Sequence, residues 1–208
     1  KVLPGDIKYK DVNGDGVITS DDQVPLSSNP NYPRLMYGFG AEFRWKKLTL
    51  GLLFKGVGNV ENYVVDYWKS GSEFLPFGTG TTGNVLAITA NQGNRWTPRE
   101  ISGTPATENP NAMFPRLSYG NDHNSVQNST FWKTNARYLR LQEINLSYNF
   151  TSGKILKAVG VSSLDLQFVA SNVCVWSPFK HWDPELAAYN GTAYPIPARY
   201  AFQMYINF

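Results

Sequence analysis

The feature that most constrains this chain is a regular alternation of apolar and polar side chains over long segments. From Leu35 to Trp45 every second residue is apolar or aromatic, and the same phase resumes at Leu48 after Lys46-Lys47. Because neighbouring side chains of a β-strand point to opposite faces, this period predicts strands with one apolar and one polar face. Residues 35–57 are therefore predicted to form two antiparallel strands joined by a very tight turn.

Three further strands are predicted near 137–150, 163–175 and 200–208 from the same alternation. In the first of them, residues 144–150 keep one phase, whereas residues 138–141 have the other. An extra residue in one strand shifts the phase in this way, so we expect a β-bulge between these two stretches. The chain is thus predicted to be all-β, with about five antiparallel strands.

The predicted connections differ strongly in length. Those at 46–47 and about 151–162 are short, whereas those at about 58–136 and 176–198 are long. Since the strands run alternately up and down, both long loops are expected on one side. Short periplasmic turns and long extracellular loops are typical of a bacterial outer-membrane barrel. Residues 1–33 are accordingly expected to be an extracellular segment, and residues 34–208 to be the C-terminal part of a transmembrane β-barrel.

A soluble β-sandwich would also show alternation in its half-buried strands. The predicted strands are longer than the roughly 5 or 6 residues usual in soluble proteins, and their polar face carries glycine, charged and amide residues, as a wet lumen permits. The last strand stops on Phe208, which resembles the C-terminal signal of outer-membrane barrel proteins. Five strands cannot close a barrel, and bare edges aggregate, so the remaining strands are expected upstream.

Composition removes several classes of function. The net charge of +3 comes from scattered lysines and arginines, so no nucleic-acid partner is expected. Aromatic residues reach 14% and charged residues only 17%, which suits a sugar-binding or membrane-interface protein. Asp183 and Glu185 flank Pro184 and give no support for a glycosidase pair, so no enzyme is predicted. Loop tryptophans are expected either to stack on sugar or to pack and anchor; they are Trp68, Trp96, Trp132, Trp176 and Trp182.

Residues 11–22 match the loop of an EF-hand calcium site. Oxygen-bearing side chains stand at positions 1, 3 and 5, a glycine at position 6 permits the sharp turn, and an acid stands at position 12. Aspartate replaces the usual glutamate at the last position, as in dockerin-type loops. The expected ligands of a structural calcium ion are Asp11, Asn13, Asp15, the carbonyl of Val17, and Asp22. The alternative is an Asx-rich turn without a metal.

The order of short segments resembles the C-terminal region of SusC/RagA-type TonB-dependent transporters of Bacteroidetes. The resemblance covers nearly the whole chain, and each segment is weak alone. It departs from the usual pattern at Arg99-Glu100 and in the insertion that runs to Glu108. The segments are PGDIKY at 4–9, DVNGDG at 11–16, NP at 29–30, YGF at 37–39, NRWTP at 94–98, PRL at 115–117, YLRL at 138–141, DPE at 183–185 and YP at 194–195.

This resemblance implies a 22-stranded barrel with an N-terminal plug in the outer membrane of a Gram-negative cell, of which this chain would form the last five strands. It implies import of oligosaccharides or peptides, a SusD-like surface lipoprotein as partner, and energy from the TonB complex. The plug and the TonB box would lie upstream. The residues alone leave a second hypothesis open, a secreted carbohydrate-binding β-module stabilised by calcium.

Overall fold

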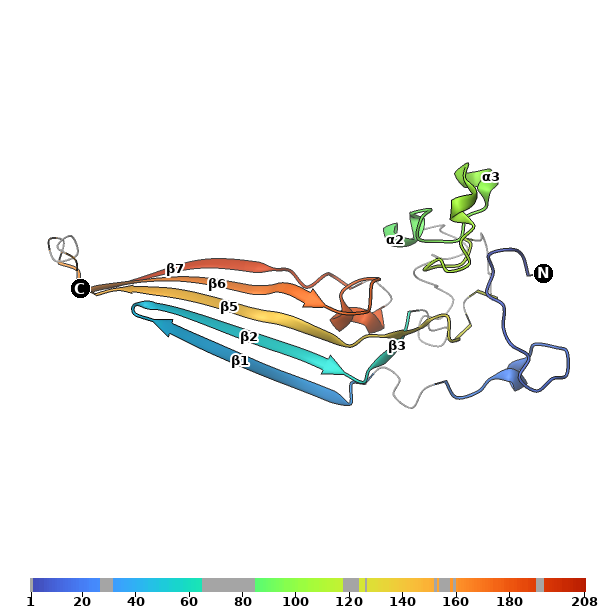
Figure 1. Cartoon of the computed structure of the whole chain (residues 1–208), viewed down its shortest axis with the longest axis horizontal. Helices are drawn as coiled ribbons and strands as arrows, with labels where there is room; N and C mark the ends of the chain where they lie inside the picture. The colour runs from blue at the N-terminus through green and yellow to red at the C-terminus, as the bar shows by residue number, and fades with distance from the viewer. Residues whose placement is uncertain are drawn as a thin grey trace. The chain divides into compact units, whose positions relative to one another are not determined.

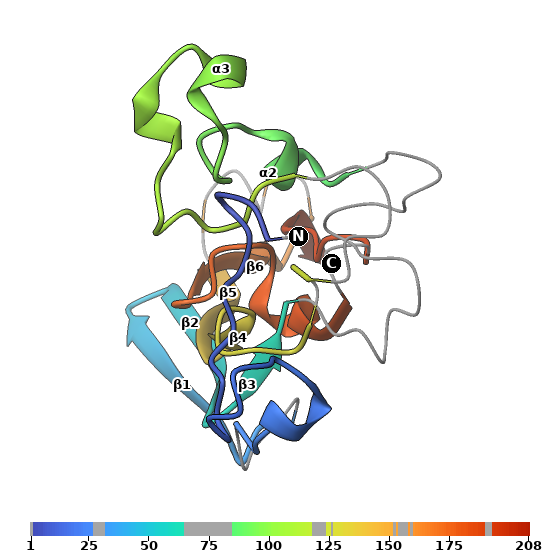
Figure 2. The same cartoon turned by 90° about the vertical axis from the view of Figure 1, so that its right-hand side faces the viewer.

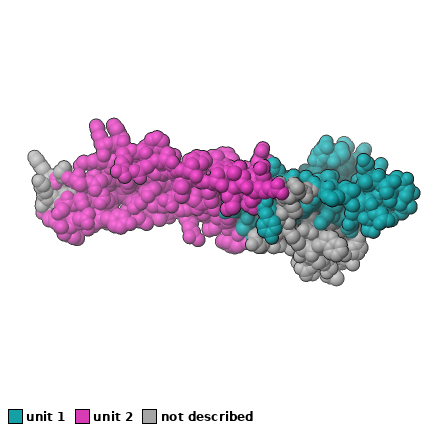
Figure 3. All heavy atoms as spheres, turned by 90° about the horizontal axis from the view of Figure 1, so that it is seen from below, with its two compact units in different colours: residues 1–32, 61–135, 181–193 teal, residues 33–60, 136–180, 194–208 magenta. Residues whose placement is uncertain are grey.

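The computed structural model describes residues 2–26, 32–64, 85–117, 124–125, 127–151, 153, 158, 160–189 and 193–208. These residues form two compact units, which Figure 3 shows in different colours. We call them the sheet unit, with residues 33–60, 136–180 and 194–208, and the loop unit, with residues 1–32, 61–135 and 181–193. The N-terminal segment is thus grouped with parts of both long connections.

The sheet unit is a five-stranded antiparallel sheet (Figure 1). Its strands, in spatial order, are β1 (Leu35–Trp45), β2 (Leu48–Gly58), β5 (Tyr138–Phe150), β6 (Ser163–Trp176) and β7 (Arg199–Asn207). Each predicted strand is confirmed to within one or two residues. The prediction succeeded because a long period of two, with one face uniformly apolar, specifies both the strand and its register.

The predicted bulge in β5 is confirmed at Gln142. Leu141 pairs with Phe54 and Glu143 pairs with Leu53, so Gln142 has no opposite residue on β2. A further irregularity lies on the other side of β5, where Asn172 and its neighbour Val173 separate the paired residues of β6. Asn172 has a φ of 55°, in the left-handed region. The extra residues bring the apolar side chains on both sides of the bulge back to one face.

The connections leave the sheet as predicted. The short β1–β2 turn, the end of β5 and the start of β6 lie at one end of the sheet, and the long connections, from β2 to β5 and from β6 to β7, start at the other. The extracellular position of these long loops stays a prediction. Among the described residues, no helix is long and apolar enough to cross a membrane.

The loop unit contains a second small sheet that the sequence did not predict, formed by β3 (Glu61–Tyr63) and β4 (Lys133–Asn135). Its helices are short, and α2 and α3 are labelled in Figure 2. They are η1 (Ser20–Asp22), α2 (Ala87–Ala90), α3 (Arg99–Ser102), η2 (Pro105–Thr107) and η3 (Pro184–Tyr189). Buried Phe114 and Trp132 form the centre of this unit, with ring centroids 6.3 Å apart.

Candidate functional site

The first candidate site is the apolar face of the five-stranded sheet. Directly paired residues share a face, and the register aligns the apolar positions of all strands. One such row crosses the whole sheet and consists of Phe43, Leu50, Leu146, Phe168 and Phe202. The sequence predicted the members of this face strand by strand, and the register joins them into one surface.

No described residue covers this face as a second layer would. On the two edge strands of the sheet, Trp45 of β1 is 69% exposed and Phe202 of β7 is 85% exposed. Soluble proteins rarely leave a contiguous apolar patch of this kind in water, because each Å² of apolar area exposed costs about 25 cal/mol. The face therefore requires an apolar environment.

The opposite face is polar and its groups bond across the strands. The Gln167 side-chain amide donates to Asn145 Oδ1 at 2.9 Å, and the Asn207 amide donates to Ser163 Oγ at 2.7 Å. The Asn149 amide donates to the Asp165 carboxylate. This face can lie against water or against another polar surface, so the two faces need different surroundings.

Aromatic side chains stand near both ends of the apolar face. Trp45 and Tyr148 lie in the row next to the short turns, whereas Tyr37 and Trp176 share a row next to the long connections. Trp176 is exposed at this end of the face, a position that suits anchoring at a membrane interface, one of the two roles expected for it from the sequence. Tyrosine and tryptophan concentrate at the two interfaces of a membrane with water, because their rings are apolar and their tips polar.

The other loop tryptophans have different positions. Trp132 is 1% exposed and its indole N–H donates to the Ser125 carbonyl at 2.9 Å, so it packs and cannot stack on a ligand from this position. The Trp182 indole donates to the Leu186 carbonyl at 3.0 Å. Trp96 lies over Gly5, whose φ of 88° and missing side chain permit the close approach. Trp68 lies outside the described residues.

The second candidate site is the acidic loop at residues 11–22. The two carboxylate oxygens of Asp11 accept hydrogen bonds from the backbone N–H groups of Gly14 at 2.6 Å and Gly16 at 2.8 Å. Asp15 Oδ1 accepts from the Val17 N–H at 2.8 Å, and Asn13 Oδ1 accepts from the Asp15 N–H at 2.9 Å. Both glycines have positive φ, so the chain turns back on itself and these side chains lie inside the turn.

Asp22 closes this loop. Its carboxylate accepts from the N–H groups of Thr19 at 2.8 Å and Val12 at 2.7 Å. These bonds, with Thr19 first and Val12 second, lower the pKa of Asp22 below its ordinary value of 3.8. The order that Asp22 gives to the loop is therefore present above that ordinary pKa and is lost as the pH falls through the lowered one.

The fit of this loop to calcium rests on its donor set. A hard cation takes six to eight oxygens, and the predicted residues supply carboxylate, amide and carbonyl oxygens in the required order. No group of three acidic, histidine or cysteine side chains converges on a common point among the described residues. The oxygens instead hold backbone N–H groups, the arrangement that an Asx-rich turn also uses. Calcium binding stays a prediction.

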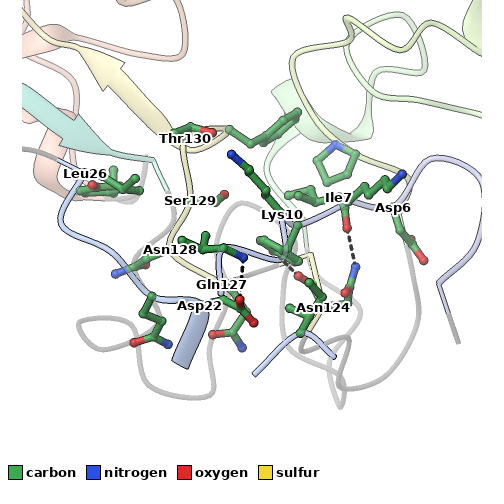
Figure 4. A pocket seen from close by; sticks show the side chains of 18 of the residues that line it. Asp6, Ile7, Lys10, Asp22, Leu26, Asn124, Gln127, Asn128, Ser129 and Thr130 are labelled. Carbon is green, nitrogen blue, oxygen red and sulfur yellow. Dashed lines mark hydrogen bonds between the residues drawn. The ribbon is translucent and has the colours of Figure 1, made fainter. Parts of the chain in front are cut away.

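A pocket of about 1250 Å³ lies within the loop unit (Figure 4). Its labelled residues come from the N-terminal segment and from residues 124–130. The Asn124 side-chain amide donates to the Ile7 carbonyl at 3.0 Å and fastens these two parts to each other. Asp6 forms an ion pair with Arg116, and Asp22 accepts backbone N–H groups, so both carboxylates hold segments of the loop unit in place.

Other ionisable side chains of the loop unit have contacts that explain them as structural. Burial lowers the pKa of His181 to about 4, and the ring meets Phe114 edge-on with centroids 5.5 Å apart. Arg99 and Glu108 form an ion pair within the insertion, and this pairing lowers the pKa of Glu108. The pair Asp183 and Glu185 also lies in this unit, where the Glu185 N–H donates to Asp183 Oδ1 at 2.9 Å.

Comparison with known proteins gives one curated relative and several solved structures. No family model matches the sequence. TonB-dependent receptor P26 of Formosa agariphila is 27% identical over 219 aligned positions, which cover 98% of this chain. The chain spans only 20% of the length of that relative.

The solved structures share the fold at low sequence identity. The RagAB peptide transporter matches 92% of this chain and 19% of its own, with 18% identity and a TM-score of 0.58. The RagAB peptide importer in the open-open state matches 85% of this chain and 17% of its own, with 20% identity and a TM-score of 0.53. Sequence and fold together confirm the predicted resemblance to SusC/RagA-type TonB-dependent transporters, and the antiparallel sheet matches part of such a β-barrel.

Proposed function

We propose that this chain forms part of the membrane-spanning wall of a TonB-dependent importer in the bacterial outer membrane. The observation that carries the proposal is the apolar face, which continues across all five strands and which no described residue covers. In a bilayer this face contacts lipid, and the polar face lies toward the lumen.

The length of the strands supports this proposal. β1 and β2 each have 11 residues, which at about 3.3 Å per residue span about 36 Å. A tilt of about 45° shortens this to about 26 Å along the membrane normal, close to the apolar band of about 25 Å in outer-membrane barrels. β5 and β6 are longer because each contains the irregularity near Gln142 and each extends past Leu48 at the end of the sheet where the short β1–β2 turn lies.

The sheet also needs further β-strands at its two edges. Within the described residues, β1 and β7 each pair along one edge only. A sheet in lipid must satisfy its backbone groups internally, so the other edges would pair with further strands of the same barrel. That barrel is expected to have 22 strands and a plug, as the family resemblance implies.

We propose the cargo and the partners from the similarity to the relatives. An importer of this family would take up oligosaccharides or peptides, would work with a SusD-like surface lipoprotein, and would draw energy from the TonB complex. The RagAB complexes are described as peptide importers, which supports the peptide class. The chain would bind and pass its cargo without chemistry, so we infer no enzymatic activity.

The secreted carbohydrate-binding module is the less favoured hypothesis. A soluble module would have to cover the apolar face or accept a large exposed area, and a face of this extent would lead to aggregation in water. The acidic loop and the aromatic residues, which motivated that hypothesis, are equally compatible with an extracellular loop of a transporter.

We further propose that the acidic loop binds a structural calcium ion through Asp11, Asn13, Asp15, the Val17 carbonyl and Asp22. The support is the type and order of the donors and the turn that gathers them inside one loop. Bound calcium would neutralise the acidic side chains and hold this part of the loop unit in one conformation.

Fractionation of the native cell tests the proposed location. The full-length protein should sediment with the outer membrane, resist extraction by high salt and alkali, and migrate differently on gels when heated, because its barrel unfolds only on boiling. Recovery of the protein as a soluble periplasmic or secreted species would contradict the proposal. An integral inner-membrane protein of known location is the control for the separation of the two membranes.

A further inference from the structure

We propose that the β1–β2 turn binds the anionic headgroup of a membrane phospholipid through Lys46 and Lys47, with Trp45 as the apolar anchor below them. This inference rests on the proposed membrane location of the sheet. Figure 1 shows the turn at the end of the sheet where the chain terminus also lies. The apolar face of β1 and β2 ends here, whereas β5 to β7 carry one further apolar row, Phe150, Leu164 and Ile206. The turn is therefore the point at which β1 and β2 meet the headgroups.

The geometry of the turn places a positive charge at the rim of the apolar face. Trp45 belongs to this face and is mostly exposed, and the Lys46 ammonium lies 5.0 Å from the centroid of its ring. The stacked ammonium stays at the level of the interface, where a tryptophan ring is also favoured. The Asn149 N–H donates to the Lys47 carbonyl at 3.0 Å and ties the turn to β5.

No acidic side chain competes for this charge on the same face. The apolar face of the described strands contains no aspartate or glutamate. The acids nearest to the turn, Glu42 and Asp165, lie on the polar face and bind Arg44 and Asn149 respectively. Among the described strands, no acidic side chain on the apolar face offsets the two lysines, so the turn is cationic and complements an anionic headgroup.

The backbone of the turn supports a role for Lys46 beyond connection. Its φ is 54°, in the left-handed region, where a two-residue hairpin favours glycine or asparagine. A lysine costs stability at this position relative to those residues. The backbone conformation of the turn therefore does not favour lysine at this position, so the residue can be replaced without loss of stability. Lys46→Asn should keep or improve the turn while it removes the charge.

The experiment uses the full-length protein in nanodiscs of phosphatidylethanolamine and phosphatidylglycerol. Native mass spectrometry after release counts the lipids that remain bound. We expect wild type to retain phosphatidylglycerol in preference, and each of Lys46→Asn and Lys47→Gln to lower that preference about fivefold. Lys46→Arg should retain it, and Lys10→Gln, an exposed lysine of the loop unit, should leave it unchanged.

Two results would overturn the inference. One is that wild type retains both phospholipids equally, or that Lys46→Asn and Lys47→Gln retain phosphatidylglycerol with the same preference as wild type. The other is a loss of the preference for phosphatidylglycerol in Lys10→Gln as large as in Lys46→Asn, because the effect would then follow total charge and not the turn. Heat-dependent gel migration of every sample reports insertion independently, so a protein that inserts but lacks the preference contradicts only the lipid site. A protein that never inserts contradicts the proposed function.

Discussion

At the scale of single residues, the acidic loop shows how one set of contacts serves two hypotheses. Asp11, Asp15 and Asp22 each accept backbone N–H groups within the loop. The spacing of these residues is visible in the sequence, and their enclosure in one turn follows from the glycines. Whether the remaining oxygen lone pairs hold an ion depends on a few tenths of an ångström, which no sequence pattern specifies.

Replacing Asp15 tests the calcium proposal. Bound calcium should slow hydrogen exchange of peptides that cover residues 11–22, by about 100-fold when calcium exceeds its dissociation constant about 100 times. Asp15→Ala should abolish this difference between calcium and chelator, because it removes a carboxylate at a ligand position. Asp21→Ala is the matched control, since Asp21 is an exposed acid of the same loop outside the predicted ligand set.

The proposal fails if wild type shows the same exchange in calcium and in chelator. An equal loss of calcium protection in the Asp21 variant would also contradict it, because the effect would then reflect loop charge and not the predicted ligands.

At the scale of elements, the strands were largely predictable and the loops were not. Residues such as Ile144 and Tyr138 lie on opposite sides of a phase change, and this change alone predicted the bulge that Gln142 forms. The irregularity at Asn172 was missed because it lies near the end of β6, beyond the clear alternation. β3 and β4 were missed because three residues are too few to show a period.

Gly56 offers a test of the register. A methyl group added at Gly56 would lie 2.5 Å from Tyr37 Cζ and 2.6 Å from the Tyr138 carbonyl oxygen. Gly56→Ala should therefore destabilise the sheet by roughly 1–3 kcal/mol through overpacking. Gly51→Ala is the control, since its added methyl would meet its nearest neighbour, Asn145 Cβ, at an ordinary 3.6 Å.

Urea unfolding of the full-length protein in lipid vesicles measures the difference. If Gly56→Ala were as stable as Gly51→Ala, Tyr37 would not lie over Gly56, and the pairing of β1 with β2 would have to be revised.

At the scale of the whole molecule, the fold class was predictable because it follows from repeated local alternation. The grouping of residues into the loop unit was not, because it depends on contacts between distant parts of the chain. The ion pair of Asp6 with Arg116 and the bond from Asn124 to the Ile7 carbonyl join segments more than a hundred positions apart. No local pattern in the sequence marks such partners.

The central claim is that the two faces of the sheet have different surroundings, lipid on one side and the lumen on the other. Phe202 and Gln203 are neighbours on β7 and point to opposite faces. Each is replaced by cysteine in the full-length protein with Cys174→Ser, labelled with a fluorophore, and reconstituted in vesicles that contain brominated lipid. We expect strong quenching of the label at Phe202→Cys and little at Gln203→Cys; equal quenching at both positions, or stronger quenching at Gln203→Cys, would contradict the account.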